Sequence, residues 1–189
     1  MIELPEGIVL AKQLDETLRG KKIVQVTANA SPHKFAWFYG NPAGYDTLLS
    51  GRTVQCADSY GGKVHIELSR DGGMMFCEGI ALRYYDTPAK LPKKHQLLVE
   101  LDGATFLAAT VQMYGGLYGY EGELENKYDD IARVKPPVLS DDFDVTYFKS
   151  LVPGDKLKLS AKAFLATEQR IPGLGNGVAQ DILFNAGLS

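Results

Sequence analysis

The stretch Ile171-Pro172-Gly173-Leu174-Gly175-Asn176-Gly177 separates two segments of helical character near the C-terminus. Residues 160–168 are mostly good helix formers, and apolar side chains recur at helical spacing from Val178 to Ala186. Three glycines and a proline within six residues predict a tight turn. Such a turn presents backbone N–H groups at the start of the second helix, where the helix dipole favours an anion. The pattern indicates a helix–turn–helix unit that contacts nucleic acid, or else a Gly-rich loop that joins two packed helices.

The composition limits the possible partners. The chain has 189 residues, 45% of them hydrophobic, enough for one large domain or two small ones. Its formal net charge of −3 excludes an overall basic surface, so a nucleic-acid footprint would be a local patch. Cys56 and Cys77 form no CxxC pair, which predicts buried free thiols and no zinc site. Because the sequence shows no signal peptide and no run of ~20 apolar residues, we expect a cytoplasmic, nucleoid-associated protein without membrane contact.

The spacing of apolar residues changes along the chain and predicts an α+β fold. A helix is expected over residues 5–20, where apolar side chains form one stripe. Over residues 21–120 the period is two, broken by Gly and Asp turns, which is typical of an antiparallel sandwich or barrel. The acidic, irregular residues 121–130 and the following Pro136-Pro137 are interpreted as an interdomain linker.

The last part of the chain is expected to be helical. Ser140 or Asp141 would cap a helix that carries several large apolar side chains, namely Phe143, Tyr147, Phe148 and Leu151. We therefore predict two domains. Residues 1–125 would hold the first helix and the β-sandwich, and residues 126–189 the linker and the helical unit.

The chain opens with Met1-Ile2-Glu3-Leu4-Pro5-Glu6, in which two carboxylates lie three residues apart at a helix start. Taken alone, acidic side chains there would complement the helix dipole. Together with the turn Gly173-Leu174-Gly175-Asn176 they resemble the formamidopyrimidine-DNA glycosylase and endonuclease VIII family of base-excision repair enzymes. That family begins Met-Pro-Glu-Leu-Pro-Glu and has a Gly-x-Gly-Asn turn in its helix–two-turn–helix motif. Gly62-Lys63, Lys94-His95 and Leu139-Ser140 follow in the family's order, so the resemblance covers most of the chain.

The resemblance implies a glycosylase-like domain and a helix–two-turn–helix DNA-binding domain, acting as a monomer on damaged or abasic double-stranded DNA. In the family the initiator methionine is removed. The exposed proline amine then attacks C1′ of the damaged nucleotide and forms a Schiff base, and elimination cuts the strand. Glu3 would handle protons at the sugar, with Glu6 in support. The other implied contacts are to the DNA backbone, from Lys63, Lys162, Gly175 and Asn176.

The first departure from the family is at its nucleophile, where Ile2 replaces the proline. A residue this bulky normally blocks removal of the initiator methionine, so the terminal amine would belong to Met1. One residue spans up to ~3.3–3.6 Å, and a misplacement of ~1 Å costs on the order of 100-fold in rate. We therefore expect proline-type glycosylase activity to be absent or much weakened.

A second departure is Thr110-Val111-Gln112-Met113-Tyr114-Gly115, where the family usually has Asp-Pro-Arg-Arg-Phe-Gly. Gln112, Met113 and Tyr114 would act as a wedge between base steps, or else pack at a domain interface. Because the arginine is missing, the family's lesion preference cannot be carried over. The aromatic residues 35–39 would be a stacking platform for bases, or the edge of a core under a loop.

The family continues into a zinc finger that binds one zinc ion, whereas this chain ends just after the motif helix. We expect a truncated piece rather than a member without the finger, and no cofactor in this chain. Three functions stay open. The first is a binder of damaged or abasic duplex DNA with little catalysis. The second is an active glycosylase or abasic-site lyase that uses the Met1 amine or a lysine such as Lys63. The third is a non-catalytic scaffold or RNA-associated protein.

Overall fold

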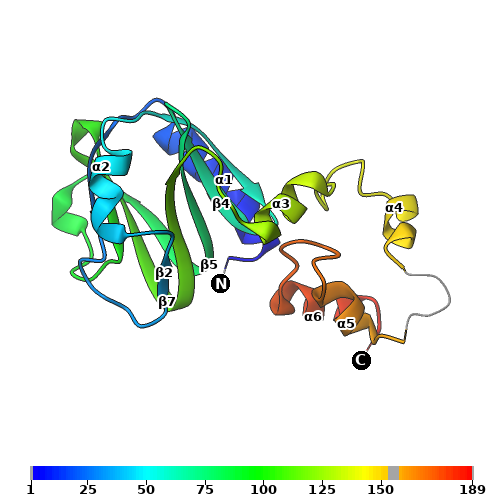
Figure 1. The fold of residues 1–189 in the computed structure, drawn as a ribbon. Helices are drawn as coiled ribbons and strands as arrows, with labels where there is room; N and C mark the ends of the chain where they lie inside the picture. The colour runs from blue at the N-terminus through cyan, green and yellow to red at the C-terminus, as the bar shows by residue number, and fades with distance from the viewer. Residues whose placement is uncertain (1, 153–157, 189) are drawn as a thin grey trace.

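The computed structural model describes residues 2–152 and 158–188. Its helices are α1 (Leu4–Leu18), α2 (Tyr45–Leu49), α3 (Lys127–Val134), α4 (Val145–Ser150), α5 (Ala161–Ala166) and α6 (Asn176–Asn185). Its strands are β1 (Ile23–Ala28), β2 (Ala36–Phe38), β3 (Val54–Tyr60), β4 (Lys63–Leu68), β5 (Gly72–Tyr85), β6 (Leu97–Leu101) and β7 (Thr105–Glu121). Figure 1 shows a larger lobe built on the sheet and a smaller one that contains α4, α5 and α6, called here the sheet lobe and the helical lobe.

The sheet has seven strands in the order β1-β6-β7-β5-β4-β3, with β2 beside β7, and every pair along this path is antiparallel. The α+β fold and the antiparallel sheet predicted from the alternating pattern are confirmed. The strands form one continuous sheet because β5 and β7 are long enough to pair with each other and with β4 and β6. β2 is an exception, because it pairs with β7 in parallel.

The core of the sheet lobe lies between the sheet and α1. On α1 the buried side chains Ala11, Leu14 and Leu18 recur at helical spacing and join the apolar cluster of the strands. The helical lobe has a separate small cluster around Phe164, Leu165 and Ile171. Among the described residues, none of the helices is both long and apolar enough to cross a bilayer.

Two helices differ from the sequence expectation, because their N-caps lie where the sequence analysis did not place them. The predicted linker contains α3, whose N-cap Asn126 accepts hydrogen bonds from Tyr128 and Asp129 N–H. The helix expected from Ser140 begins later, as α4, because Asp144 rather than Ser140 or Asp141 caps it. α5 is correctly predicted, though shorter, and Ser160 caps it.

The predicted Gly-rich turn is the contact between the lobes. Gly173 has φ +80° and packs so closely on the β3–β4 turn that an added Cβ would lie 2.3 Å from the carbonyl carbon of Gly61. The carbonyl of Gly173 also accepts a hydrogen bond from Leu4 N–H, at 2.9 Å. Only glycine combines this backbone conformation with such a close approach. The turn therefore joins the helical lobe to the start of α1.

A buried hydrogen-bonded cluster holds α3 on the sheet lobe. Asp129 Oδ1 lies 2.8 Å from His65 Nε2, and its Oδ2 accepts a hydrogen bond from Arg133, also at 2.8 Å. Burial alone would raise the pKa of Asp129, but these hydrogen bonds and charges lower it below its ordinary value. Arg133 also lies over the Tyr60 ring, 4.2 Å from its centroid. His65 is therefore part of the contact that holds α3 on the sheet lobe.

Candidate functional site

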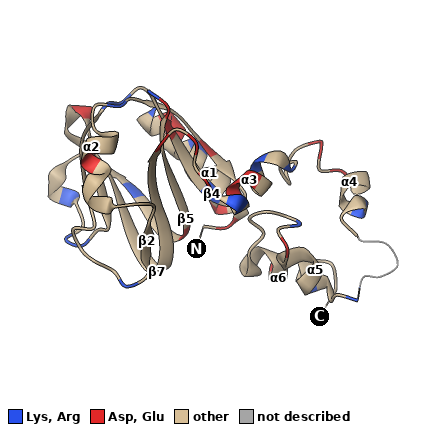
Figure 2. Ribbon diagram, viewed as in Figure 1, with Lys and Arg blue, Asp and Glu red and all other residues tan. Residues whose placement is uncertain are grey.

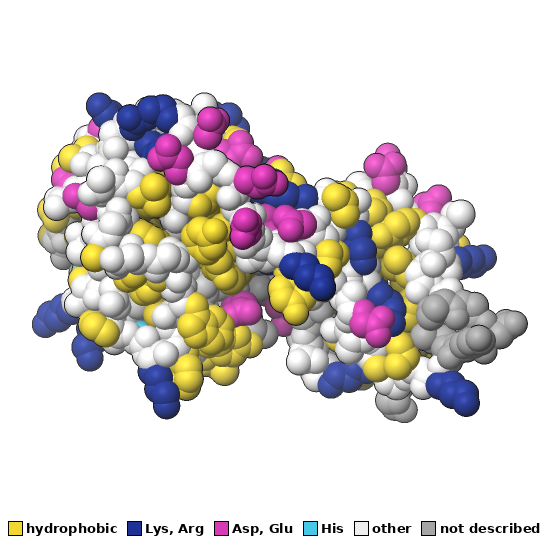
Figure 3. All heavy atoms as spheres, viewed as in Figure 1, with side chains coloured by type: hydrophobic (Ala, Val, Ile, Leu, Met, Phe, Trp, Pro, Cys, Tyr) yellow, Lys and Arg dark blue, Asp and Glu magenta, His cyan; other side chains and the backbone are white. Residues whose placement is uncertain are grey.

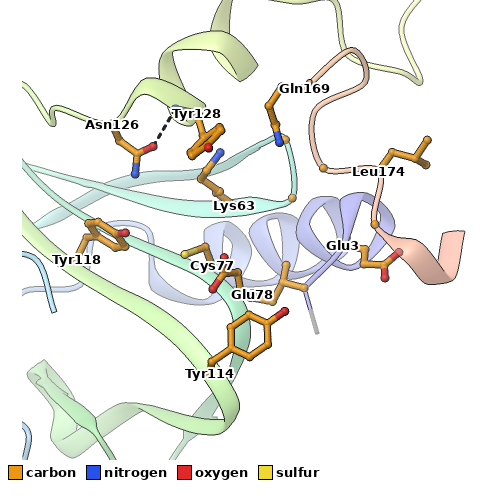
Figure 4. A pocket seen from close by; sticks show the side chains of 15 residues that line it. Glu3, Lys63, Cys77, Glu78, Tyr114, Tyr118, Asn126, Tyr128, Gln169 and Leu174 are labelled. Atoms are coloured by element: carbon orange, nitrogen blue, oxygen red, sulfur yellow. Dashed lines mark hydrogen bonds between the residues drawn. The ribbon is translucent and has the colours of Figure 1, made fainter. Parts of the chain in front are cut away.

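A cleft with a volume of about 500 Å³ lies where the two lobes meet. It is lined by the first residues of the chain, the β3–β4 turn, β5, β7, the start of α3 and the Gly-rich turn. Figure 4 shows the lining side chains from both lobes, and Figure 3 shows the narrow waist between the lobes, with acidic side chains at its surface. Lys/Arg and Asp/Glu are scattered over both lobes in Figure 2, so no wide basic face is visible in that view.

Ile2, the residue at the family's nucleophile position, is built into the protein interior. Its side chain is 8% exposed and belongs to the core cluster of the sheet lobe. Its backbone N–H donates to the carbonyl of Glu78 at 2.6 Å, within an antiparallel bridge. Residue 2 therefore contributes a buried side chain and a hydrogen-bonded peptide to the cleft wall. The terminal amine of Met1, the alternative nucleophile, lies outside the described residues.

Glu3 occupies the position where the sequence predicted an external anion. Its carboxylate accepts hydrogen bonds from the N–H groups of Gly177, at 3.1 Å, and Val178, at 2.9 Å, in the first turn of α6. The helix dipole and the free first-turn N–H groups favour a negative charge there. The anion that they bind is thus a side chain of the same protein. Glu6 is exposed and accepts a hydrogen bond from Glu3 N–H at 3.2 Å, so it caps α1.

Lys63 lies at the start of β4 and lines the cleft. Its burial lowers the pKa of the ammonium group, which the negative charges of Asp129 and Glu78 partly oppose. A partly buried amine with a lowered pKa is more nucleophilic at neutral pH than an exposed lysine. Lys63 is therefore able to contact a phosphate or to act as a base or nucleophile.

Glu78 is a cleft residue that the sequence reasoning missed. Its backbone has φ +65° at a register shift between β5 and β7, and its Oε2 is buried without a hydrogen-bond partner among the described residues. Burial raises the pKa of this carboxyl group, although the charge of Lys63 opposes the effect. The signal available in the sequence was a single acidic residue within an otherwise apolar strand, from Met74 to Leu82.

Two of the three proposed wedge residues, Met113 and Tyr114, line one groove with Phe35 and Trp37 from the aromatic segment 35–39. Met113 is 70% exposed, and Gln112 is also exposed, so neither packs between the lobes. Tyr114 lines the cleft, and its ring lies 5.7 Å from that of Trp37. We call the apolar groove beside the cleft the aromatic edge; its lining residues are Phe35, Trp37, Met113 and Tyr114. Figure 3 shows hydrophobic side chains gathered on the sheet lobe next to the waist.

The remaining predicted DNA contacts are divided between two places. Gly175 lines the cleft and is the N-cap of α6. Asn176 is exposed and is the first residue of α6. Lys162 is exposed on α5 and lines a different, largely apolar groove with Leu183 and Phe184. The structure thus brings Glu3, Lys63, Tyr114 and Gly175 to one cleft, but not Lys162.

No metal centre is formed within residues 2–152 and 158–188, which contain no group of three or more His, Cys, Asp or Glu side chains able to hold an ion. Cys56 and Cys77 are free thiols. Burial is the largest cause that raises the pKa of each to about 11, so both are weak nucleophiles at neutral pH.

Comparison with known proteins finds relatives along the whole chain, although no family model matches it. The formamidopyrimidine-DNA glycosylase of Acidiphilium cryptum is 29% identical over 188 residues, covering 100% of this chain and 66% of the relative. The enzyme of that name from Arabidopsis thaliana is 26% identical over 204 residues and covers 98% of this chain and 50% of the relative. The chain spans about two thirds of the length of the first curated relatives that it matches.

Solved structures show the same fold. The MutM (Fpg) protein of Thermus thermophilus superimposes with a TM-score of 0.71 at 22% identity, covering 99% of this chain and 65% of that one. A complex between the Lactococcus lactis Fpg and DNA containing an abasic site has a TM-score of 0.79 at 20% identity, covering 99% of this chain and 68% of that one.

Proposed function

We propose that this chain, a homologue of the formamidopyrimidine-DNA glycosylases, binds duplex DNA that carries a damaged or abasic nucleotide. We further propose that base excision through residue 2 is absent or weak. The relatives supply the first half of the proposal, because the related fold of Lactococcus lactis Fpg binds abasic DNA. The burial and peptide hydrogen bond of Ile2 support the second half.

The cleft and the aromatic edge would each contact a different part of the DNA. Lys63 would lie beside the lesion nucleotide in the cleft, where the low local dielectric strengthens polar contacts. Met113 and Trp37, 70% and 49% exposed, would stack on bases left unpaired by the lesion. Neither contact depends on an amine at residue 2, so binding survives the loss of the proline.

The binding half is tested with three labelled probes: an intact duplex, the same duplex with a tetrahydrofuran abasic analogue, and a structured RNA. We expect the abasic duplex to bind most tightly. Its affinity should fall as salt rises from about 50 to 200 mM, because phosphate contacts release counterions. Equal affinity for all three probes would instead favour a scaffold or RNA-associated role.

The aromatic edge is tested by Met113→Ala and Trp37→Ala, which should weaken binding to the abasic duplex more than to intact DNA. Loss of a stacked base costs about 1–3 kcal/mol. Phe184→Ala is the matched control, because Phe184 is 83% exposed on the helical lobe and lies outside both the cleft and the aromatic edge. Equal weakening by all three variants would remove the aromatic edge from the binding surface.

The catalytic half is tested by Ile2→Pro, with Ile2→Val as the control for lost core volume. Mass spectrometry establishes whether the initiator methionine is removed, and an oxidised-base duplex reports excision and strand cleavage. We expect the proline variant to gain excision and the valine variant to stay inactive. Excision by the unmodified chain at the rate of the proline variant would contradict this half of the proposal.

A further inference from the structure

The cleft contains an amine that does not depend on residue 2. Lys63 is the only side-chain amine among the described residues that line it. No hydrogen bond or ion pair occupies its Nζ within the described part of the chain. Lys135 is different, because its Nζ donates to the carbonyls of Gln169 and Arg170 and supports the turn before α6. Of these amines, Lys63 is the one available to a ligand.

The strand register places a carboxyl group beside this amine. Val64 of β4 pairs with Phe76 of β5, so Lys63, one residue earlier, lies alongside Cys77 and Glu78. Figure 4 shows Lys63, Cys77 and Glu78 on neighbouring strands of the cleft wall, with the Lys63 nitrogen directed toward Tyr128. The buried Oε2 of Glu78 has no partner among the described residues, although buried polar atoms are nearly always hydrogen-bonded. This carboxyl group therefore has an open position for a hydroxyl or an imine N–H.

The surroundings of Lys63 lower the pKa of its amine overall. Burial is the largest cause that lowers its pKa, and Arg133 acts in the same direction. Asp129, Cys77 and Glu78 act in the opposite direction, and none of them forms an ion pair with Lys63. Cys77 itself does not compete as a nucleophile, since its thiol is buried and its pKa is raised to about 11.

We propose that Lys63 is the imine-forming nucleophile of this cleft and that Glu78 transfers the protons, so that the chain cleaves DNA at abasic sites. The lone pair of Nζ attacks the C1′ aldehyde of the ring-opened sugar and gives a carbinolamine. Glu78 protonates the hydroxyl group, which leaves as water, and an iminium ion remains. The Glu78 carboxylate, which has just given up its proton, takes a C2′ proton; the electron pair of that C–H bond forms the C2′–C3′ double bond, and the C3′–O bond breaks with the phosphate as the leaving group. Water finally hydrolyses the imine, which frees Lys63 and leaves an unsaturated aldehyde on the sugar.

This inference rests on the proposed binding of abasic DNA, and the experiment separates the two. The protein is mixed with a duplex that carries a natural abasic site, in the presence of borohydride, and the covalent adduct is quantified and mapped by mass spectrometry. Binding is measured in parallel on the tetrahydrofuran duplex, which has no aldehyde. Lys63→Arg keeps the positive charge but not the nucleophile, and Lys12→Arg, on the exposed face of α1, is the matched control.

We expect the adduct to map to Lys63, to disappear in Lys63→Arg and to be unchanged in Lys12→Arg. Lys63→Arg should bind the tetrahydrofuran duplex within about threefold of the unmodified chain. Glu78→Gln should slow adduct formation by about 100-fold, the usual size of a general acid–base contribution. An adduct at the terminal amine, or tight binding without any adduct, would overturn the role of Lys63. Absence of binding to the tetrahydrofuran duplex would instead overturn the proposed function.

Discussion

Two regions face the same cleft with similar chemical groups and use them differently. In the N-terminal segment, residues 2–6, the Ile2 N–H donates to Glu78 and the Glu3 carboxylate accepts two N–H groups of α6. On the neighbouring strands β4 and β5, Lys63 has no ion pair within the described residues, and Glu78 has a buried oxygen with no partner there.

The two regions differ in which of their groups remain available for chemistry. A carboxylate that accepts two backbone hydrogen bonds at a helix start is held as a structural anion. A buried carboxyl group without a partner costs stability, and natural proteins retain such groups mainly where they have a role. The N-terminal segment therefore serves chiefly to join the lobes, and β4 and β5 carry the reactive groups.

The largest expected effect tests a carboxylate that is fully partnered, Asp129. Asp129→Asn removes the charge that pairs with His65 and Arg133, and we expect a loss of about 3 kcal/mol in the free energy of unfolding. The pKa of Asp129 is lowered in the folded state, so the ionised carboxylate stabilises the fold. This stabilisation is complete above the ordinary aspartate pKa of about 3.9 and is lost as the pH falls through the lower pKa of the folded protein. Urea unfolding between about pH 2 and 7 should show a smaller acid-induced loss in the variant.

The second prediction concerns Gly173, whose turn connects the helical lobe to the N-terminal segment. Gly173→Ala places a Cβ against the backbone of Gly61 and forces alanine into a left-handed conformation. We expect a loss of about 2–3 kcal/mol. Gly187→Ala is the matched control, because Gly187 also has a positive φ but an added Cβ there meets nothing within 4 Å. Equal losses in thermal or urea unfolding would mean that the contact with Gly61 contributes nothing.

The third prediction compares the two N-terminal acids. Glu3→Gln should lose about 1–2 kcal/mol, because a charge-assisted interaction with the start of α6 becomes a neutral one. Glu6→Gln should change stability by less than about 0.5 kcal/mol, since Glu6 is exposed and an amide oxygen replaces its single cap contact. Urea unfolding of both variants measures the difference. If they lose the same amount, Glu3 is not a special structural anion.

The sequence was sufficient for the parts of the molecule that follow local rules. Helix periodicity predicted α1, strand alternation predicted the antiparallel sheet, and the Gly-rich turn predicted the link into α6. It placed α4 too early because Ser140, Asp141 and Asp144 are all residue types that cap helices, and the cap in the structure is Asp144. It missed α3 because the acidic composition resembled a linker, although Asp129 and Arg133 are spaced for an i,i+4 pair.

The cleft could be predicted only in part, because it depends on contacts between distant segments. The pairing of Glu3 with α6 joins residues 174 and 175 positions apart, and nothing local indicates that the carboxylate fills the anion position. Glu78 looked like an ordinary strand residue, and its role becomes visible only when β4 and β5 are in register. The sequence shows which residues are acidic or basic, but it does not show which residues each of these side chains contacts in the folded protein.

The last prediction concerns Glu78 and has the opposite sign, a gain of stability on substitution. Burial raises the pKa of Glu78 in the folded state, so this carboxyl group opposes folding at neutral pH. As the pH rises from the ordinary glutamate pKa of about 4.3 through the higher folded value, the chain should lose stability. Glu78→Gln removes the charge that must be desolvated, and we expect a gain of up to about 1 kcal/mol at about pH 7.

The pH dependence of this variant decides whether Glu78 belongs with the structural or the reactive groups. Below about pH 4 the variant and the unmodified chain should be equally stable, because both are then neutral at this position. Urea midpoints on the acidic and the neutral side measure the difference. A loss of stability at neutral pH would show that the Glu78 carboxylate is partnered and structural, as Glu3 is. A gain at neutral pH together with slower trapping on abasic DNA would show that this group costs the fold stability and serves the reaction.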